Sequence, residues 1–525
     1  MADQGESLDL ASPKEREVIT FQVGNYSNFV GGHYWNLQES LFKEASAKKN
    51  SFNELSQDIL YRHGLNFETG RSSYKPRVVS FDLKENVRNF PSADETATDD
   101  TDDGIFWDGN VEKYDRGSKN SGSNTADEVG LFWTDFTLSC FHDKSSQVVD
   151  LLHNQMSEGF DHFGCGEMLF KSGKFYNEFE DRLHFFSEEC DRLQGFQVFT
   201  DIHDGFAGLS SSILQDLADD YSKKFSLCFA MMPGILGDDG KQTVEKTMLN
   251  TMLSFGKYIE SDCQVIPLSL RSSYGLRREP VEFPYINYKA SSTYQTSAIL
   301  ASAIDTATLP FRLSNDQATD ISTLIGPISV AGRKISALTM GLPIPLSSTG
   351  SVNDILNGPM DFNISLTPDT SRPESILAQT TVVRGIPTHL LKLEEYNLVS
   401  RRLSAMLQYK TNHGHICPSY VVQTPCKFTL QFPDIFKPSV TQIGCIIEDY
   451  NRPEEVKVSS TSAMASLVNC EEISRPLERL YKDTNKFDGM NYSGFLKAGT
   501  EQADIEDSRE KLKVLAEAYK SDYEL

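Results

Sequence analysis

Near the N-terminus, the chain has an apolar run, then a glycine, then apolar residues at helical spacing. Residues 18–23 read Val-Ile-Thr-Phe-Gln-Val, and Gly24 follows them directly. Apolar residues then recur at steps of three and four, at Phe29, Val30, Tyr34, Leu37 and Leu41. The pattern predicts a buried strand, a tight turn and an amphipathic helix.

The same alternation of strands and helices continues along the chain. Segments 77–83, 195–200 and 225–232 are apolar over most of their length, as expected for strands buried on both faces. Helical spacing separates them, with one helix expected from Phe179 to Leu193 and another from Ile213 to Tyr221. This order predicts a mostly parallel sheet covered by helices on both sides.

The pattern changes after about residue 310. Segments 334–340 and 375–384 look like strands, and short strands are expected between 418 and 447. A final helix is expected from Glu501 to about Tyr523. Because strands and helices no longer alternate, this part predicts a second, α+β domain followed by C-terminal helices.

Size and charge narrow the class of protein. The 525 residues exceed what one core needs and predict two or three domains, and the composition is that of a soluble globular protein. The formal net charge of −24 repels DNA, RNA and anionic lipid surfaces, so no nucleic-acid partner is expected. No apolar run is long enough for a membrane helix, so any contact with an organelle is expected to be peripheral.

Cysteine usage indicates the redox compartment. The nine cysteines form no C-x-x-C pair, and an odd number is a poor disulfide framework. We interpret them as reduced thiols of a cytosolic protein.

Two segments have the composition of disordered chain. Residues 1–17 are polar and are predicted to be a disordered leader without the pattern of a targeting peptide. Residues 91–128 begin with six crowded carboxylates and continue into a Gly/Ser/Asn stretch. They predict a solvated insertion, with an acidic docking segment for a basic partner as the alternative.

The first strand, turn and helix carry a motif that resembles tubulin. Gln22, Gly24, Asn28 and Gly31 follow the tubulin pattern Q-x-G-x-x-x-N-x-x-G. In tubulin this turn brings backbone N–H groups and a helix N-terminus to the nucleotide phosphates. The resemblance implies that Gly24 and Asn28 belong to a nucleotide-type pocket.

Four more motifs follow in the order that tubulin has. Residues 190–201 resemble C-x-x-L-Q-G-F-Q before the phosphate loop, and 250–254 resemble N-A-T-L-S, whose Asn contacts guanine. Residues 299–313 resemble the central helix, and the late F-L-K-A-G resembles the start of the last helices. The resemblance therefore covers nearly the whole chain.

Together, the pattern and the resemblance give the predicted architecture. The fold class is α/β, with a tubulin-like GTPase-type N-terminal domain, a second α+β domain and C-terminal helices. The ranges are 18–270 for the nucleotide-binding-type domain with its insertion at 91–128, 271–330 for the central helix region, 331–460 for the second domain and 461–525 for the C-terminal helices.

The phosphate loop departs from tubulin's G-G-G-T-G-S-G. Residues 204–210 read D-G-F-A-G-L-S, so only Gly205 and Gly208 remain. A phosphate cradle needs glycines because its N–H groups must point inward without a Cβ in the way. Asp204 adds a charge that repels phosphate and Phe206 adds bulk, which predicts a weakened pocket.

Residues that would support hydrolysis depart as well. In the loop on the Mg²⁺ side, Asp82 is kept but Lys84 replaces a carboxylate. The loop that would reach a neighbouring subunit's nucleotide has Ala318, Asp320 and Thr323 at the aligned positions, without the acidic group that activates water. We therefore predict no GTP hydrolysis, no catalytic residue and no enzymatic activity.

The predicted nucleotide pocket is degenerate. Its residues are Gly24, Asn28, Asp82, Gly205, Gly208 and Asn250. Each also has a structural interpretation, as a turn residue, a helix cap or a loop hydrogen bonder. No cofactor is therefore predicted, and a bound GTP or GDP is kept as the alternative.

Two other groups of residues carry side chains of catalytic or metal-ligand type. His203 and Asp204 beside the loop suggest acid–base catalysis only weakly, because no nucleophile pattern accompanies them. His413, His415 and Cys417 are of ligand type, but a zinc site would need a second cluster, and no metal is predicted.

Residues 183–208 and 299–313, with the long insertion, resemble the Misato family rather than tubulin itself. That resemblance implies a cytoplasmic protein, peripheral at the mitochondrial outer membrane, that regulates mitochondrial distribution and morphology. It also implies a role in spindle microtubule organisation, with tubulin or a microtubule-associated protein as partner. The alternatives are a GTP-binding or GTP-hydrolysing cytoskeletal protein and a chaperone-like partner that mimics a tubulin subunit.

Overall fold

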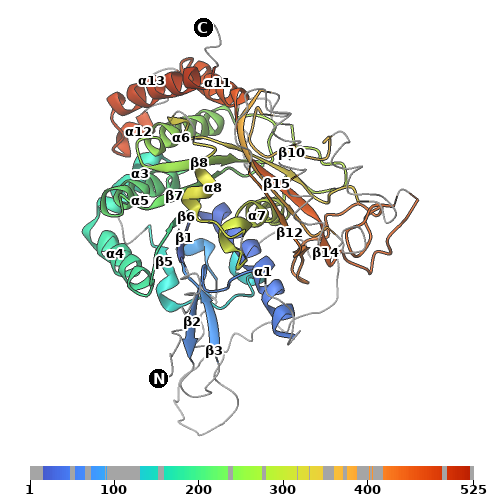
Figure 1. Cartoon of the computed structure of the whole chain (residues 1–525). Coiled ribbons are helices and arrows are strands. Elements are labelled where there is room, and N and C mark those ends of the chain that lie inside the picture. Colours follow the sequence, from blue (N-terminus) through green and yellow to red (C-terminus); the bar gives the residue numbers. More distant parts are fainter. Residues whose placement is uncertain are drawn as a thin grey trace, which may run out of the picture.

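Two β-sheets separated by a central helix form the body of the protein in the computed structural model (Figure 1). The structure describes residues 16–47, 54–65, 72–88, 90, 131–151, 159–234, 240–274, 279–315, 317–329, 332–346, 360–370, 375–386, 401, 405, 418–447, 449–487 and 493–520. Residues 1–15 of the predicted leader, the predicted insertion at 91–128 and the segment 413–417 lie outside this part. The predicted α/β fold class, with its second mixed domain and C-terminal helices, is confirmed.

The first sheet has six strands that all run parallel, in the order β5-β4-β1-β6-β7-β8. Its apolar strands are buried on both faces, as parallel strands in α/β folds usually are. The strands are β1 (Val18–Val23), β4 (Val78–Leu83), β5 (Ser146–Val149), β6 (Gly195–Asp201), β7 (Phe225–Met231) and β8 (Cys263–Leu268).

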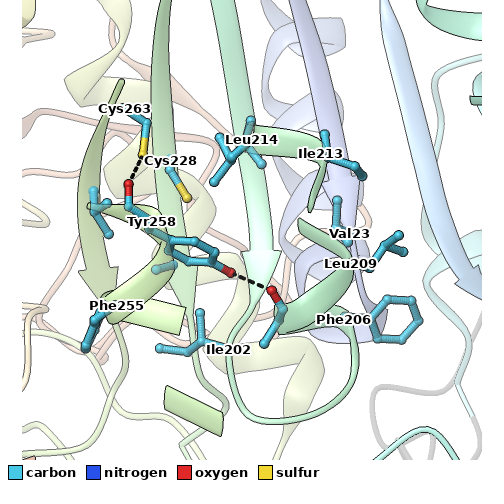
Figure 2. Close-up of a cluster of buried hydrophobic side chains, with 14 of the residues drawn as sticks. Val23, Ile202, Phe206, Leu209, Ile213, Leu214, Cys228, Phe255, Tyr258 and Cys263 are labelled. Carbon is cyan, nitrogen blue, oxygen red and sulfur yellow. Dashed lines mark hydrogen bonds between the residues drawn. The ribbon is translucent and has the colours of Figure 1, made fainter. Parts of the chain in front are cut away.

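Two helical layers cover this sheet. One face packs against α1 (Asn25–Ala47) and α7 (Thr293–Ala307). The other face packs against α3 (Phe163–Lys171), α4 (Gly173–Glu188), α5 (Phe206–Asp220) and α6 (Lys241–Tyr258). Figure 2 shows part of this second core, where Tyr258 lies near Cys228 and Ile202, and Val23 and Leu209 lie closer to Phe206. The Tyr258 hydroxyl lies 2.6 Å from Ser210 Oγ, so its polar end is hydrogen-bonded within the core.

The second sheet is mixed, in the order β10-β9-β15-β11-β12. Only the β11–β12 pair is parallel, which fits a separate α+β unit. Helix α7 contacts β9, β11 and β15 as well as α1, so it joins the two sheets, which also meet directly where β8 contacts β9. The strands are β9 (Ala337–Gly341), β10 (Ile364–Ser365), β11 (Ile376–Arg384), β12 (Ser419–Val422) and β15 (Ala463–Cys470).

The C-terminal helices and several short elements complete the described part. Helices α11 (Ser474–Thr484) and α13 (Gln502–Ala518) pack together on α6, outside the first sheet (Figure 1). None of the helices in the described ranges combines the length and apolar character that a bilayer crossing requires. The remaining elements are β2 (Tyr61–Leu65), β3 (Ser72–Pro76), α2 (Trp133–Phe136), α8 (Ile321–Ile325), β13 (Cys426–Lys427), β14 (Ser460–Thr461) and α12 (Ser493–Lys497), with short 3-10 turns at 84–86, 143–145, 309–312 and 471–473.

Two predicted helix ends differ from the structure. The helix expected to reach Leu193 ends at Glu188, because the chain turns at Cys190 and then runs beside Glu17 toward β6. The last helix ends at Ala518 rather than near Tyr523. Tyr519 caps it, and its hydroxyl donates a hydrogen bond to the Ile335 carbonyl at 2.6 Å.

Candidate functional site

A cavity of about 390 Å³ lies at the carboxyl edge of the parallel sheet. Ligands of open α/β sheets bind at this edge, where strands end and helices begin. The last residues of β4 and β6 and the first residues of α1 and α5 contribute to its wall. The polar lining residues are Asn25, Tyr26, Glu85, Asn86, Asp161, Asp201, His203, Asp204 and Thr293.

The N-terminus of α1 faces this cavity, but the N–H groups of its second and third residues are already bonded. Asp201, the last residue of β6, accepts hydrogen bonds from the backbone N–H groups of Tyr26 at 2.9 Å and Ser27 at 2.8 Å. Its carboxylate also accepts the Ser27 hydroxyl at 2.6 Å. A helix N-terminus favours an anion through its unpaired N–H groups and its dipole. Here the anion is a side chain of the protein.

Gly24 makes room for this carboxylate. Its φ is +112°, a conformation that suits glycine, and a Cβ added there would lie 2.4 Å from Asp201 Oδ2. Val23 pairs with Thr200 across β1 and β6, which places the Gly24 turn directly beside Asp201. The residue that resembles a nucleotide-contacting glycine therefore accommodates Asp201.

The loop that corresponds to the phosphate cradle is bonded in the same way. Asp204 Oδ1 accepts the Phe206 N–H at 2.9 Å, and the Asp204 carbonyl accepts that of Ala207 at 3.2 Å. The Gly205 N–H donates to the Phe160 carbonyl at 2.8 Å, and the Gly208 N–H donates to Gly205. Each of these N–H groups already has a partner within the protein.

The two glycines of this loop allow a close approach by α3. A Cβ on Gly208 would lie 1.9 Å from the Phe163 carbonyl oxygen, and one on Gly205 would lie 2.7 Å from that of Phe160. Phe206 is buried and packs edge-on against the Phe160 ring, with centroids 4.9 Å apart. The bulk predicted for Phe206 is therefore directed into the contact with residues 160–163.

Asp82 and Asn28 are joined to each other below the cavity. Asp82 Oδ2 accepts from Asn28 Nδ2 at 3.1 Å and from the Trp133 indole N–H at 3.0 Å. Asp82 Oδ1 accepts from Asn86 Nδ2 at 2.9 Å and from the Leu83 N–H at 2.8 Å. Burial raises the pKa of Asp82 to about 7, although these bonds favour its charged form. Its four hydrogen bonds hold the end of β4 in place.

Asn250 lies in α6, and its side chain bridges backbone groups. Its Oδ1 accepts the Phe163 N–H at 2.9 Å at the start of α3. Its Nδ2 donates to the carbonyls of Asp161 at 2.9 Å and His203 at 2.8 Å. The structure thus uses this amide to hold the loops around the cavity.

The residues predicted at the hydrolytic side do not converge on the cavity. Lys84 forms an exposed ion pair with Asp150 at 3.0 Å. Asp320 caps α8 by accepting the Thr323 N–H at 2.8 Å, and α8 lies at the amino edge of the sheet, where Ile321 approaches Gly195. Ala318 lies in the loop before α8, where its N–H donates to the Asn315 carbonyl at 2.9 Å. The loop with Lys84 and the loop with residues 318–323 therefore lie on opposite edges of the sheet.

Three ionisable residues that line the cavity have shifted pKa values. Burial, followed by the negative charge of Asp204, raises the pKa of Asp201, and burial raises that of Asp204 to about 7. Burial lowers the pKa of His203 to about 4, with a smaller contribution from the Arg271 charge. His203 Nε2 lies 3.6 Å from Asp204 Oδ2, and at neutral pH this contact involves an uncharged imidazole.

Asp201 is the site residue that sequence reasoning missed. It stands at the end of an apolar strand, where a carboxylate is costly unless it is bonded. A carboxylate at the end of an apolar strand was therefore the available signal. The register between β1 and β6, which brings Asp201 beside the Gly24 turn, was absent from the sequence pattern.

Comparison with known proteins gives the class first. The Misato Segment II tubulin-like domain matches residues 16–128, and the Tubulin domain matches residues 122–313. These matches cover the six-stranded parallel sheet and α7, so the fold and the site define a tubulin-like protein.

Full-length relatives give the family. Protein misato homolog 1 of Mus musculus and that of Homo sapiens are each 30% identical to this chain, over 96% of it and 98% of the relative. Protein misato of Drosophila melanogaster is 25% identical over the same shares. The chain belongs to the Misato family.

Proposed function

We propose that this chain is a non-enzymatic, tubulin-related protein that regulates mitochondrial distribution and morphology, with a second role in spindle microtubule organisation. The observation that carries the non-enzymatic part is the occupation of both helix N-termini by side chains. Asp201 takes the N–H groups of α1, and Asp204 takes the first N–H of α5. The phosphates of GTP need those groups, so the residues present do not fit them.

Energetics support the same conclusion. To admit a phosphate, the protein would have to break three hydrogen bonds to Asp201 and leave its buried carboxylate without them. A buried polar group without a partner costs about 1–3 kcal/mol, and more when it is charged. The incoming phosphate would also meet the nearby carboxyl groups of Asp201 and Asp204, and each of them repels it when ionised. We therefore expect neither bound nucleotide nor GTP turnover.

The proposed setting is the cytoplasm, with peripheral attachment at the mitochondrial outer membrane. The proposed partner is tubulin or a microtubule-associated protein, which a tubulin-like surface could engage without a nucleotide. The net charge of −24 opposes direct binding to anionic lipid, so attachment through a protein on the membrane is favoured.

Turnover of GTP tests the non-enzymatic part. Purified full-length chain at high concentration should release no phosphate above a protein-free blank, with assembled tubulin as the positive control. Chromatography of the denatured protein should show no co-purified guanine nucleotide. Stoichiometric GDP or GTP, or turnover comparable with tubulin, would refute this part of the proposal.

Cell imaging tests the mitochondrial part. Depleting the protein should fragment or cluster mitochondria, and re-expression of the wild-type chain should restore the network. Rescue by Lys84→Ala should be complete, because this exposed residue contributes nothing to the proposed role. Normal mitochondria after full depletion would contradict the proposal.

A further inference from the structure

The cavity at the carboxyl edge has the charge of a cation site. Four of its lining residues are carboxylates, Glu85, Asp161, Asp201 and Asp204, and no lining residue in the described chain is Lys or Arg. Asp161 is balanced from outside by Lys246 at 2.6 Å. Asp201 and Asp204 have no ion pair with Lys or Arg among the described salt bridges, so no protein cation pairs with these two carboxyl groups when they ionise.

Three ligand-type side chains converge in this centre. One ligand atom from each of Asp201, His203 and Asp204 lies within 4.8 Å of the other two. Side chains around a single metal ion need this proximity, because metal–ligand bonds are about 2.0–2.2 Å long. The cluster combines an imidazole with two carboxylates, and it spans only four residues at the β6–α5 turn.

The backbone holds these side chains in position. Asp201 is fixed by its bonds to Tyr26 and Ser27, and the His203 carbonyl accepts Asn250 Nδ2 at 2.8 Å. Asp204 is fixed by the Phe206 N–H. Such supporting bonds orient the ligands of protein metal sites and keep them in place before the ion binds.

An independent observation concerns the His203 ring. Its Nδ1 is buried and has no hydrogen-bond partner within the described structure, and only 16% of the side chain is exposed. A buried nitrogen without a partner is unusual and calls for an explanation such as an ion. The other ring nitrogen, Nε2, faces Asp204 Oδ2 at 3.6 Å, and either nitrogen of a neutral imidazole can bind a metal.

We propose that Asp201, His203 and Asp204 bind one divalent first-row transition-metal ion, with water completing its coordination. A mixed imidazole and carboxylate set suits Mn²⁺ or Zn²⁺ better than Mg²⁺ or Ca²⁺, which prefer oxygen ligands alone. The ion would take the place of the nucleotide at this edge, neutralising the two carboxylates and joining the β6–α5 turn to α1. This site is independent of the proposed mitochondrial role.

Metal titration of the full-length chain tests the site. Protein stripped with a chelator is titrated with Mn²⁺, and free Mn²⁺ is followed by electron paramagnetic resonance. Mn²⁺ is chosen because thiols bind it weakly, so the free cysteines interfere little. We expect one Mn²⁺ per chain, displaced by Zn²⁺ in competition, and little competition from an equal concentration of Ca²⁺.

Matched variants locate the ion. His203→Asn and Asp204→Asn should each weaken Mn²⁺ binding at least tenfold. Asn at 204 retains an oxygen for the Phe206 N–H, so the turn is expected to fold. His184→Asn, at an exposed position on α4, should bind like the wild type. Circular dichroism of each stripped protein checks the fold separately.

Three results would overturn the proposal. The first is no Mn²⁺ or Zn²⁺ binding at millimolar concentration by folded wild-type chain. The second is binding that the folded His203 and Asp204 variants retain unchanged. The third is Mn²⁺ binding that Ca²⁺ displaces equally well, because an oxygen-only site elsewhere would then explain it.

Discussion

Two buried carboxyl groups, those of Asp201 and Asp305, have opposite electrostatic surroundings. Asp201 at the cavity accepts only N–H and hydroxyl groups and has another carboxylate, Asp204, beside it. Asp305 on α7 lies between two arginines. Arg384 of β11 is 2.5 Å from its Oδ2, and Arg312 is 2.9 Å from its Oδ1.

This difference separates a structural charge from a charge available to a ligand. The three side chains of the α7–β11 junction are 0–3% exposed and compensate one another, and Arg384 links the second sheet to α7. At the cavity, Asp201 is also buried but Asp204 is 25% exposed, and neither carboxyl group forms a described ion pair with Lys or Arg. The junction therefore holds the two sheets together, whereas the cavity edge retains a charge that can attract a ligand.

The largest expected effect is at the junction. Asp305→Asn would leave two buried guanidinium groups without a carboxylate, and breaking such a buried pair costs about 3–5 kcal/mol. Urea unfolding of the purified chain measures the loss. Asp262→Asn is the control, because Asp262 is 74% exposed and 3.7 Å from Lys334, and a surface pair contributes at most about 1 kcal/mol. Equal losses in the two variants would remove the distinction between the regions.

The next effect concerns packing at the cavity. Gly208→Ala puts a Cβ about 1.9 Å from the Phe163 carbonyl, so α3 must move away from α5. Overpacking of this kind costs about 1–3 kcal/mol, and rigid backbone on both sides favours the upper end. Gly173→Ala is matched to it, since a Cβ there meets nothing within 4 Å. Thermal unfolding should show a lower midpoint only for the Gly208 variant.

A smaller effect tests whether Asp201 stands where a phosphate would bind. Asp201→Ala leaves the N–H groups of Tyr26 and Ser27 unpaired and should cost about 2 kcal/mol. Inorganic phosphate, in chelator-treated buffer, should then stabilise this variant more than the wild type, because it can occupy the opened helix N-terminus.

Asp320→Ala serves as the control for that experiment. It also removes a helix-capping carboxylate, but α8 lies at the opposite edge of the sheet, outside the cavity. Phosphate should not stabilise it selectively. Equal phosphate responses in wild type and Asp201→Ala would show that Asp201 does not occupy an anion site.

Much of the first sheet was predictable, because its strands are continuous apolar runs. The strand, turn and helix from Val18 through α1 are as predicted, since Gly24 and the helical spacing mark the boundaries. Of the predicted pocket residues, Gly24 and Gly205 are chain neighbours of residues that line the cavity, and none of the six is itself among the described lining residues. Their contacts could not be predicted, because close approach by Asp201 and α3 depends on strand register and helix packing.

The α7–β11 junction could not be predicted from the sequence for a related reason. Asp305 and Arg384 are 79 residues apart, in a helix and a strand that meet only through tertiary packing. Each charge falls within an apolar segment, which gives no indication of its partner. Likewise, Asn250 was recognised through a tubulin-like motif, but its bonds to residues 161, 163 and 203 follow from tertiary packing alone.

The smallest expected effect sharpens the comparison with a buried group that is uncharged. His33 on α1 is 1% exposed, its Nε2 lies 3.0 Å from the Tyr294 carbonyl, and its ring stacks on Phe136. Burial lowers its pKa from 6.5 to about 3. Between these values the unfolded chain binds a proton that the folded chain does not, so this residue reduces stability as pH falls from about 6.5 toward 3.

His33→Phe removes that proton uptake and keeps an aromatic ring. The free energy of unfolding, measured in urea between pH 4 and 7, should therefore fall less steeply with acid in this variant than in the wild type. His184→Phe, on the exposed side of α4, should retain the wild-type slope. If His33→Phe also retains it, the imidazole is protonated within the fold, and α1 and α7 must accommodate a buried positive charge.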